Sequence, residues 1–198
     1  MIYNIKTVND FSLDQAEKGN ICLNPWNCPY APTTEFSGVY IKDKGFYFRF
    51  VCQEKNPRIT YFNPGDNVYE DSCMELFMNF NPEASNNYIN FELNAGGAYL
   101  FGVGPDRHGR KTLSASVMPE ICPQVFEDHW QITLFIPLQT IEEVFGKIDI
   151  KPGYRMVGNA YKCGDNTAIP HYLTWNPVVA KEPDFHRPEC FGTFVIQE

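Results

Sequence analysis

Apolar and polar residues alternate with a period of two along most of the chain, and the clearest run covers residues 73–80. One face of this run carries four apolar side chains, Met74, Leu76, Met78 and Phe80. The opposite face carries a mixed set, Cys73, Glu75, Phe77 and Asn79. Successive side chains of a strand point to opposite sides, so the run predicts a strand with one face in a core.

The next run, residues 88–94, repeats this pattern and predicts the second strand of a hairpin. Its apolar face holds Ile89, Phe91 and Leu93, and its other face holds Tyr88, Asn90, Glu92 and Asn94. Neighbouring strands lie about 4.8 Å apart. The hairpin would therefore gather Glu75 and Glu92 with several amides on one face.

Further strands and one helix follow from the same pattern. Residues 36–54 predict a hairpin that turns at Asp43-Lys44-Gly45 and places Phe46, Phe48, Phe50 and Cys52 on one face. Four more strands are predicted at 95–104, 129–137, 153–163 and 190–198. Pro137 opens a short amphipathic helix over residues 138–145, which Gly146 ends.

Composition supports this fold class, because 15 % of the residues are aromatic and 14 Gly with 15 Pro separate short apolar runs. We predict an all-β fold, an antiparallel, jelly-roll-like β-sandwich with one short helix, as a single domain over residues 1–198. Residues 1–35 are polar and Pro-rich and predict an extended arm on the surface. The sandwich itself is expected to span residues 36–198.

Charge and hydropathy exclude several classes of partner. The net charge is −8, and the 16 Lys and Arg are spread along the chain, so no basic stripe offers a nucleic-acid footprint. No apolar run approaches the roughly 20 residues that span a bilayer. The first 15 residues lack a basic segment followed by an apolar one. We expect a soluble, cytoplasmic protein, or a secreted one if a signal has been removed.

Seven cysteines without a CxxC pair point away from a disulfide framework. Their odd number, and the position of several inside predicted strands, favour buried, reduced thiols. A bridge between Cys22 and Cys28 across a loop is the alternative.

The polar face of the 73–94 hairpin has two interpretations. It is either the solvated side of an antiparallel sheet, or a ligand surface in which Phe77 and Tyr88 stand beside acids and amides. Rings stack on sugar C–H surfaces, and planar acids and amides pair with hydroxyls. An enzyme reading makes Glu75 and Glu92 a general acid/base pair for glycoside hydrolysis. No HExxH or GxSxG motif is present.

Three acids just ahead of the first strand, Asp66, Glu70 and Asp71, have two interpretations of their own. Joined by loop carbonyls they would supply oxygen ligands for a structural Ca²⁺. The alternative is a solvated acidic loop. The spacing does not match an EF-hand.

The succession of motifs resembles the family 9 carbohydrate-binding modules, which are DOMON-like β-sandwiches that grip the ends of sugar chains. The matching pieces span residues 45–198: "EDSCMELFMNF", "YINFELNAGGAY", "HWQITLFIPL", "GYRMVGNAYKC" and "YLTWNP" followed by "PDFHRPECFG". The resemblance implies non-catalytic saccharide binding within a polysaccharide-degrading system. Because members of this family often carry structural calcium, the resemblance also favours a bound Ca²⁺.

The resemblance also implies site residues. The two tryptophans that clamp a sugar ring in the family match Tyr69 and Phe185, and the strand glutamate that takes sugar hydroxyls matches Glu75. Glu92 stands where the family has an arginine, and a residue near Glu182 where it has an asparagine. Arg58, Arg155 or His186 would then supply the missing donors.

We therefore predict a non-catalytic module that binds a mono- or oligosaccharide. Tyr69 and Phe185 would stack on the ring, Glu75 and Glu92 would take hydroxyls, and Trp175 and His186 would line the pocket. The alternatives are a small hydrolase that uses Glu75 and Glu92, and a protein-interaction domain with aromatic loops.

Overall fold

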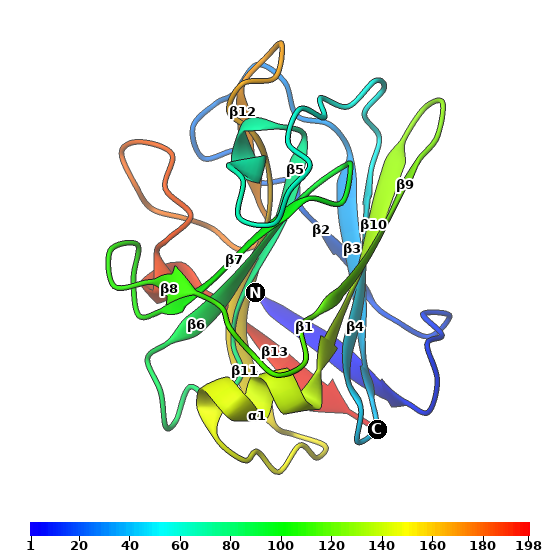
Figure 1. Ribbon diagram of the computed structural model, residues 1–198, viewed down its shortest axis with the longest axis vertical. Helices are drawn as coiled ribbons and strands as arrows, with labels where there is room; N and C mark the ends of the chain where they lie inside the picture. The colour runs from blue at the N-terminus through cyan, green and yellow to red at the C-terminus, as the bar shows by residue number, and fades with distance from the viewer.

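Thirteen strands form one curled, mixed sheet in the computed structural model, which describes residues 1–198 (Figure 1). The strands of the first half are β1 Ile2–Val8, β2 Lys18–Asn20, β3 Thr34–Ile41, β4 Gly45–Cys52, β5 Cys73–Asn79, β6 Tyr88–Asn94 and β7 Tyr99–Gly104. The others are β8 Lys111–Thr112, β9 Glu120–Val125, β10 Trp130–Pro137, β11 Arg155–Gly164, β12 His171–Thr174 and β13 Gly192–Gln197. The helices are α1 Leu138–Phe145 and two single 3₁₀ turns, η1 Val68–Glu70 and η2 Pro188–Cys190.

The sheet folds over into two facing layers and ends at β8 and β9. Its strand order is β8-β7-β6-β5-β11-β13-β1-β3-β4-β10-β9, with β12 paired to β11 and β2 to β3. Figure 1 shows β5, β6 and β7 on one side, β3, β4, β9 and β10 on the other, and α1 across one end. The predicted β-sandwich with one short helix is confirmed, but its sheet is mixed, because β1 runs parallel to both β13 and β3.

The amino-terminal prediction is wrong. Residues 1–35 are not a surface arm, because β1 lies between β13 and β3 in the middle of the sheet. Tyr3 and Ile5 point inward and are buried, whereas Ile2 is exposed. Their alternation is typical of a strand. A strand of seven residues is stable only when its neighbours in the sheet, here β13 and β3, are in place, and both are distant in sequence. The sheet thus begins at residue 2 rather than 36.

The strong periodic runs fold as predicted. β3 and β4 turn at residues 42–44, and Phe46, Phe48 and Phe50 are fully buried. α1 begins after Pro137 and ends at Gly146, which adopts a φ of 77° that favours glycine. Four short strands were missed, β2, β8, β9 and β12, and of these β8 and β9 end the sheet.

Two apolar clusters lie on opposite sides of β5 and β6. The larger, of 32 buried residues, fills the space between the layers and includes Leu76, Met78 and Phe91. The smaller, on the outer face, includes Phe77, Tyr88, Tyr161 and Phe185. No helix of the structure is long and apolar enough to cross a bilayer.

The outer face of the β5–β6 hairpin is covered, so its interpretation as the solvated side of a sheet is wrong. Every residue of both strands is buried. The late loop, residues 176–187, packs Val178 and Phe185 onto this face. Because the covering loop is distant in sequence from the hairpin, alternation alone predicted a wet side.

Candidate functional site

A pocket of about 210 Å³ opens on the outer face of the β5–β6 hairpin. Its floor comes from β5, β6 and β11, and its walls from the segment before β5, the β7–β8 loop and the late loop. The lining residues are Tyr69, Glu75, Glu92, Leu100, Arg107, Arg110, Cys163, Asp165, Tyr172, Pro183, Asp184, Phe185 and His186. Five of the six predicted site residues are among them.

Two glutamates form the floor of the pocket. Glu75 and Glu92 are directly opposite each other in the β5–β6 register, and each is only 4 % exposed. Glu92 Oε1 accepts a hydrogen bond of 2.8 Å from Asn90 Nδ2 and lies 3.5 Å from Arg110 Nη1. Glu75 Oε1 accepts only from the Cys163 thiol, at 3.0 Å. A thiol is a weak donor, so the Glu75 carboxylate is poorly satisfied.

Burial shifts the protonation of both glutamates. Desolvation, helped by Cys163 and by the neighbouring Glu92, raises the pKa of Glu75 well above its usual range. Desolvation also raises the pKa of Glu92, to about 7, although Arg110 and the Asn90 hydrogen bond oppose the rise. Two carboxyls side by side therefore hold protons more tightly than in water, and Glu92 changes its charge close to neutral pH.

Stability should fall as the pH rises from about 4.5, the pKa of Glu92 in the unfolded chain, to about 7, its folded value. The unfolded chain loses this proton first, so rising pH favours unfolding across that window. The Glu92 contribution is about 3 kcal/mol, which denaturant unfolding in metal-free buffer would measure.

The matched variant for this measurement is Glu92→Gln, which cannot titrate. Its stability difference from the parent should change between pH 4.5 and 7. His171 and His186, whose pKa values burial lowers to about 4 and about 3, act in the opposite direction, and they cancel in the difference. A difference that does not vary with pH would contradict the expectation.

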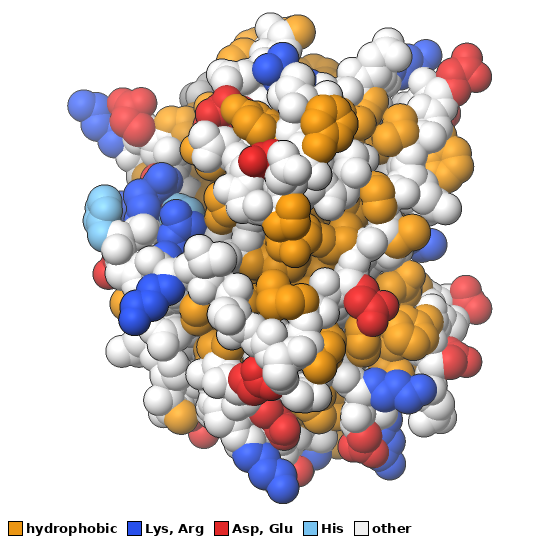
Figure 2. Space-filling model, in the orientation of Figure 1, with side chains coloured by type: hydrophobic (Ala, Val, Ile, Leu, Met, Phe, Trp, Pro, Cys, Tyr) orange, Lys and Arg blue, Asp and Glu red, His pale blue; other side chains and the backbone are white.

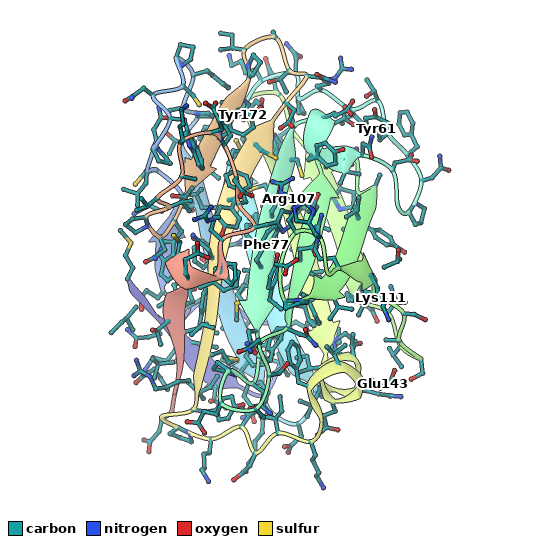
Figure 3. All side chains as sticks on the ribbon, turned by 90° about the vertical axis from the view of Figure 1, so that its left-hand side faces the viewer. Tyr61, Phe77, Arg107, Lys111, Glu143 and Tyr172 are labelled. Atoms are coloured by element: carbon teal, nitrogen blue, oxygen red, sulfur yellow. The ribbon has the colours of Figure 1, made fainter.

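A basic loop forms one wall of the pocket. The loop between β7 and β8 carries Arg107 and Arg110, and Figure 2 shows basic side chains gathered at the edge where this loop lies in Figure 1. Arg107 Nη2 binds Asp184 Oδ1 of the late loop at 2.8 Å. Figure 3 shows Arg107 in front of the hairpin, between Tyr172 and Phe77. Neither arginine was predicted as a site residue, although "DRHGR" is a dense basic segment in an acidic chain.

The aromatic rings around the pocket pack against one another. Phe185 stacks on Tyr161 with centroids 4.2 Å apart and is 7 % exposed, so one of its faces is already covered. His186 lies over Phe77, and its Nδ1 is 2.8 Å from the Tyr88 hydroxyl. Tyr69 and Tyr172 are half-buried at the rim. These two tyrosines therefore offer the freer ring surface.

Trp175 does not line the pocket, so that prediction is wrong. It directly follows β12 and turns inward to the main core, where its ring lies 5.0 Å from Phe194 and 5.8 Å from Phe36. Arg58 and Arg155 also lie outside the pocket. Arg110 occupies the donor position instead, because the β7–β8 loop folds back over Glu92.

The three acids ahead of β5 are bound to protein donors. Asp71 is fully buried and accepts hydrogen bonds from the backbone of Thr60 and Tyr61 and from the Asn94 amide. Glu70 accepts from the Tyr61 hydroxyl at 2.7 Å, and Asp66 accepts from Asn63. This arrangement fastens the segment that carries Tyr69 to the end of the hairpin.

Comparison of sequences relates the chain to known carbohydrate-binding proteins. Residues 9–196 match the family model described as Carbohydrate-binding family 9. A comparison with curated proteins gives no match. Among solved structures, a candidate carbohydrate-binding protein of Bacteroides uniformis is 25 % identical, with a TM-score of 0.86 over 99 % of both chains.

Two further structures share the fold at lower identity. Both are of a family 9 carbohydrate-binding module of Caldicellulosiruptor kristjanssonii. The complex with cellotriose is 11 % identical, with a TM-score of 0.67 over 100 % of this chain and 94 % of that chain. The complex with glucose is 10 % identical, with a TM-score of 0.68 over 100 % of this chain and 96 % of that chain.

Proposed function

The chain belongs to carbohydrate-binding family 9, and from this premise we propose that it binds a mono- or oligosaccharide in the pocket above Glu75 and Glu92. Modules of this family bind carbohydrate and are not catalysts. Because a module with this fold binds glucose and cellotriose, glucose-containing saccharides are the ligands to test first.

The observation that carries the proposal is the poorly satisfied Glu75. Its side chain is buried, forms no ion pair and accepts only from a thiol. Burying a carboxylate without good donors costs free energy, which a ligand with hydroxyl groups would recover. Glu92 is the second acceptor, directly across the strand pair. Two adjacent carboxylates suit a ligand that presents several hydroxyls side by side.

The walls add the other two features of a saccharide site. Arg107 and Arg110 provide donors for ring and hydroxyl oxygens, and Tyr69, Phe185 and Tyr172 provide apolar ring surface. A second hollow of about 410 Å³ shares Leu100 and both arginines with the pocket. A ligand longer than one sugar unit has room to continue there.

The geometry disfavours the hydrolase alternative. A glycosidase places its two carboxyls on either side of the scissile bond. Glu75 and Glu92 instead point from neighbouring strands onto one floor, and both would contact the same side of a bound sugar. We therefore propose binding without turnover.

The test is isothermal titration of the protein with glucose, cellotriose and a panel of other saccharides, with and without Ca²⁺, since structural calcium remains part of the proposal. Glu75→Gln, which keeps the shape but replaces a carboxyl oxygen with a donor amide, should weaken binding by about 10–100-fold, because a ligand hydroxyl that donates to Glu75 would lose its acceptor. The exposed Glu120→Gln on β9 is the matched control and should bind like the parent.

The outcomes distinguish three hypotheses: saccharide binding in this pocket, glycoside hydrolysis and protein interaction. Equal affinity of Glu75→Gln and the parent would remove this pocket from the proposal. Release of reducing ends from any glycoside, abolished in Glu75→Gln, would favour the hydrolase. No binding to any saccharide, together with a dimer that Tyr69→Ala converts to a monomer, would favour a protein-interaction domain.

A further inference from the structure

Two buried cysteines stand beside Glu75 at the base of the pocket. Cys73 on β5 and Cys163 on β11 are directly opposite each other in the strand register, and Glu75 follows Cys73 on the same face. The two sulfur atoms and a Glu75 carboxylate oxygen all lie within 4.8 Å of one another. All three residues are no more than 4 % exposed. The sheet therefore holds three ligand-type atoms rigidly in one place.

Saccharide binding does not account for the thiols. The Cys73 side chain does not line the pocket, and its only hydrogen bond is a weak one of 3.6 Å to the Met74 carbonyl. Cys163 lines the pocket and donates to Glu75. Apolar or hydroxyl side chains would fill these positions without placing two reactive sulfurs beside a carboxylate.

The three atoms suit a borderline-soft divalent cation. Zinc binds cysteine sulfur at about 2.3 Å and carboxylate oxygen at about 2.0–2.2 Å, in tetrahedral geometry. Ligand atoms of such a tetrahedron are roughly 3.4–3.8 Å apart. Small side-chain rotations would bring the cluster to that spacing. Thiolate ligands also exclude Ca²⁺ and Mg²⁺, which require oxygen.

The charge around the cluster favours a cation. Glu75 has no ion-pair partner, whereas Arg110 is paired with Glu92 and Arg107 with Asp184. Asp165 adds a further carboxyl to the same pocket. A divalent ion would compensate the negative charge that the two thiols and the carboxyl take on when they lose their protons.

We propose that Cys73, Cys163 and Glu75 bind Zn²⁺ or a metal of similar softness, with the fourth coordination position facing the pocket. Cys73 and Cys163 each release one proton to solvent on binding and act as thiolates, and Glu75 binds as the carboxylate after releasing any proton that it holds. Three protein ligands with one open position are the arrangement in which zinc can take a water or a ligand hydroxyl. The proposal requires no saccharide, so it can fail or succeed independently of the proposed function.

Cobalt is the probe that tests this site directly. The reduced full-length protein, freed of metal with a chelator, is titrated with Co²⁺ without any sugar. One equivalent should bind with a thiolate-to-cobalt charge-transfer band and tetrahedral ligand-field bands, and Zn²⁺ should displace it. Cys163→Ser and Glu75→Gln should each weaken binding more than the roughly 10–100-fold that loss of an outer-shell partner causes.

The control variant replaces the four cysteines outside the cluster that are exposed or half-buried, as C22S/C28S/C122S/C190S. It should keep the full charge-transfer band, as should Cys52→Ser, which removes a buried thiol elsewhere. Glu75→Gln is nearly isosteric, so it tests the site even where a cysteine variant unfolds. Absence of a thiolate band in the reduced parent, or an unchanged affinity in both Cys163→Ser and Glu75→Gln, would overturn the proposal. A Cys73–Cys163 disulfide with no metal uptake after reduction would overturn it as well.

Discussion

Asp71→Ala is expected to lower the free energy of unfolding by about 3–5 kcal/mol, the range for removing one partner of a buried ionic network. Its fully buried carboxylate accepts from the Thr60 and Tyr61 amides and from Asn94 Nδ2, at 2.8, 3.0 and 2.9 Å. Arg58 Nε lies 3.4 Å from Oδ1. Alanine would leave these donors without their acceptor around a position that is fully buried.

Urea unfolding of Asp71→Ala and the parent measures this loss, and the midpoint should move without a change in the slope. Asp66→Ala is the matched control, because it removes an acid of the same segment that lies closer to the surface. An Asp71→Ala loss no larger than that of Asp66→Ala would contradict the network. Asp71→Ala should also weaken saccharide binding, because Asp71 anchors the segment ahead of β5 that positions Tyr69 at the pocket rim.

Trp175→Ala should cost about 3–5 kcal/mol of stability, the usual loss for truncating a large buried aromatic side chain. The indole is 4 % exposed and lies among the rings of Tyr3, Phe36 and Phe194, with centroids 6.3, 5.8 and 5.0 Å away. Because these rings come from β1, β3 and β13, the cavity would open where the two layers join. Denaturant unfolding measures the loss.

Two further variants separate core packing from a binding role for Trp175. Trp175→Phe should retain most of the stability and bind saccharide like the parent, because the pocket does not include this side chain. Trp26→Ala, at a half-buried indole of the outer cluster, should cost less than Trp175→Ala. If Trp175→Phe weakened saccharide binding without a loss of stability, Trp175 would have a role in binding.

Local patterns were sufficient for the strongest elements. The alternation in residues 73–80 and 88–94 predicted both strands and a hairpin that gathers Glu75 and Glu92 on one face, and the structure sets the two residues opposite each other. Pro137 and Gly146 marked the ends of α1 because one fits the start of a helix and the other tolerates positive φ. Strand alternation and helix ends depend on interactions within a few residues, so the local sequence is enough to predict them.

Only part of the candidate site could be predicted from the sequence. Tyr69, Glu75, Glu92, Phe185 and His186 were selected from strand alternation and from the family resemblance, and the structure brings them around one pocket. Arg107, Arg110 and Asp165 were missed. Their loops gave no periodic signal, and an arginine 18 residues after Glu92 has no local reason to fold back onto it.

By itself, the sequence determined which face of each long strand is apolar, where the tight turns and the helix end, and the acid-and-amide character of one hairpin face. Tertiary structure alone decided that β1 enters the sheet between β13 and β3, that the late loop covers the hairpin, and that Cys73 meets Cys163. The physical reason is sequence separation. A side chain's alternation depends on its own strand, but its burial and its chemical neighbours depend on segments that only folding brings together.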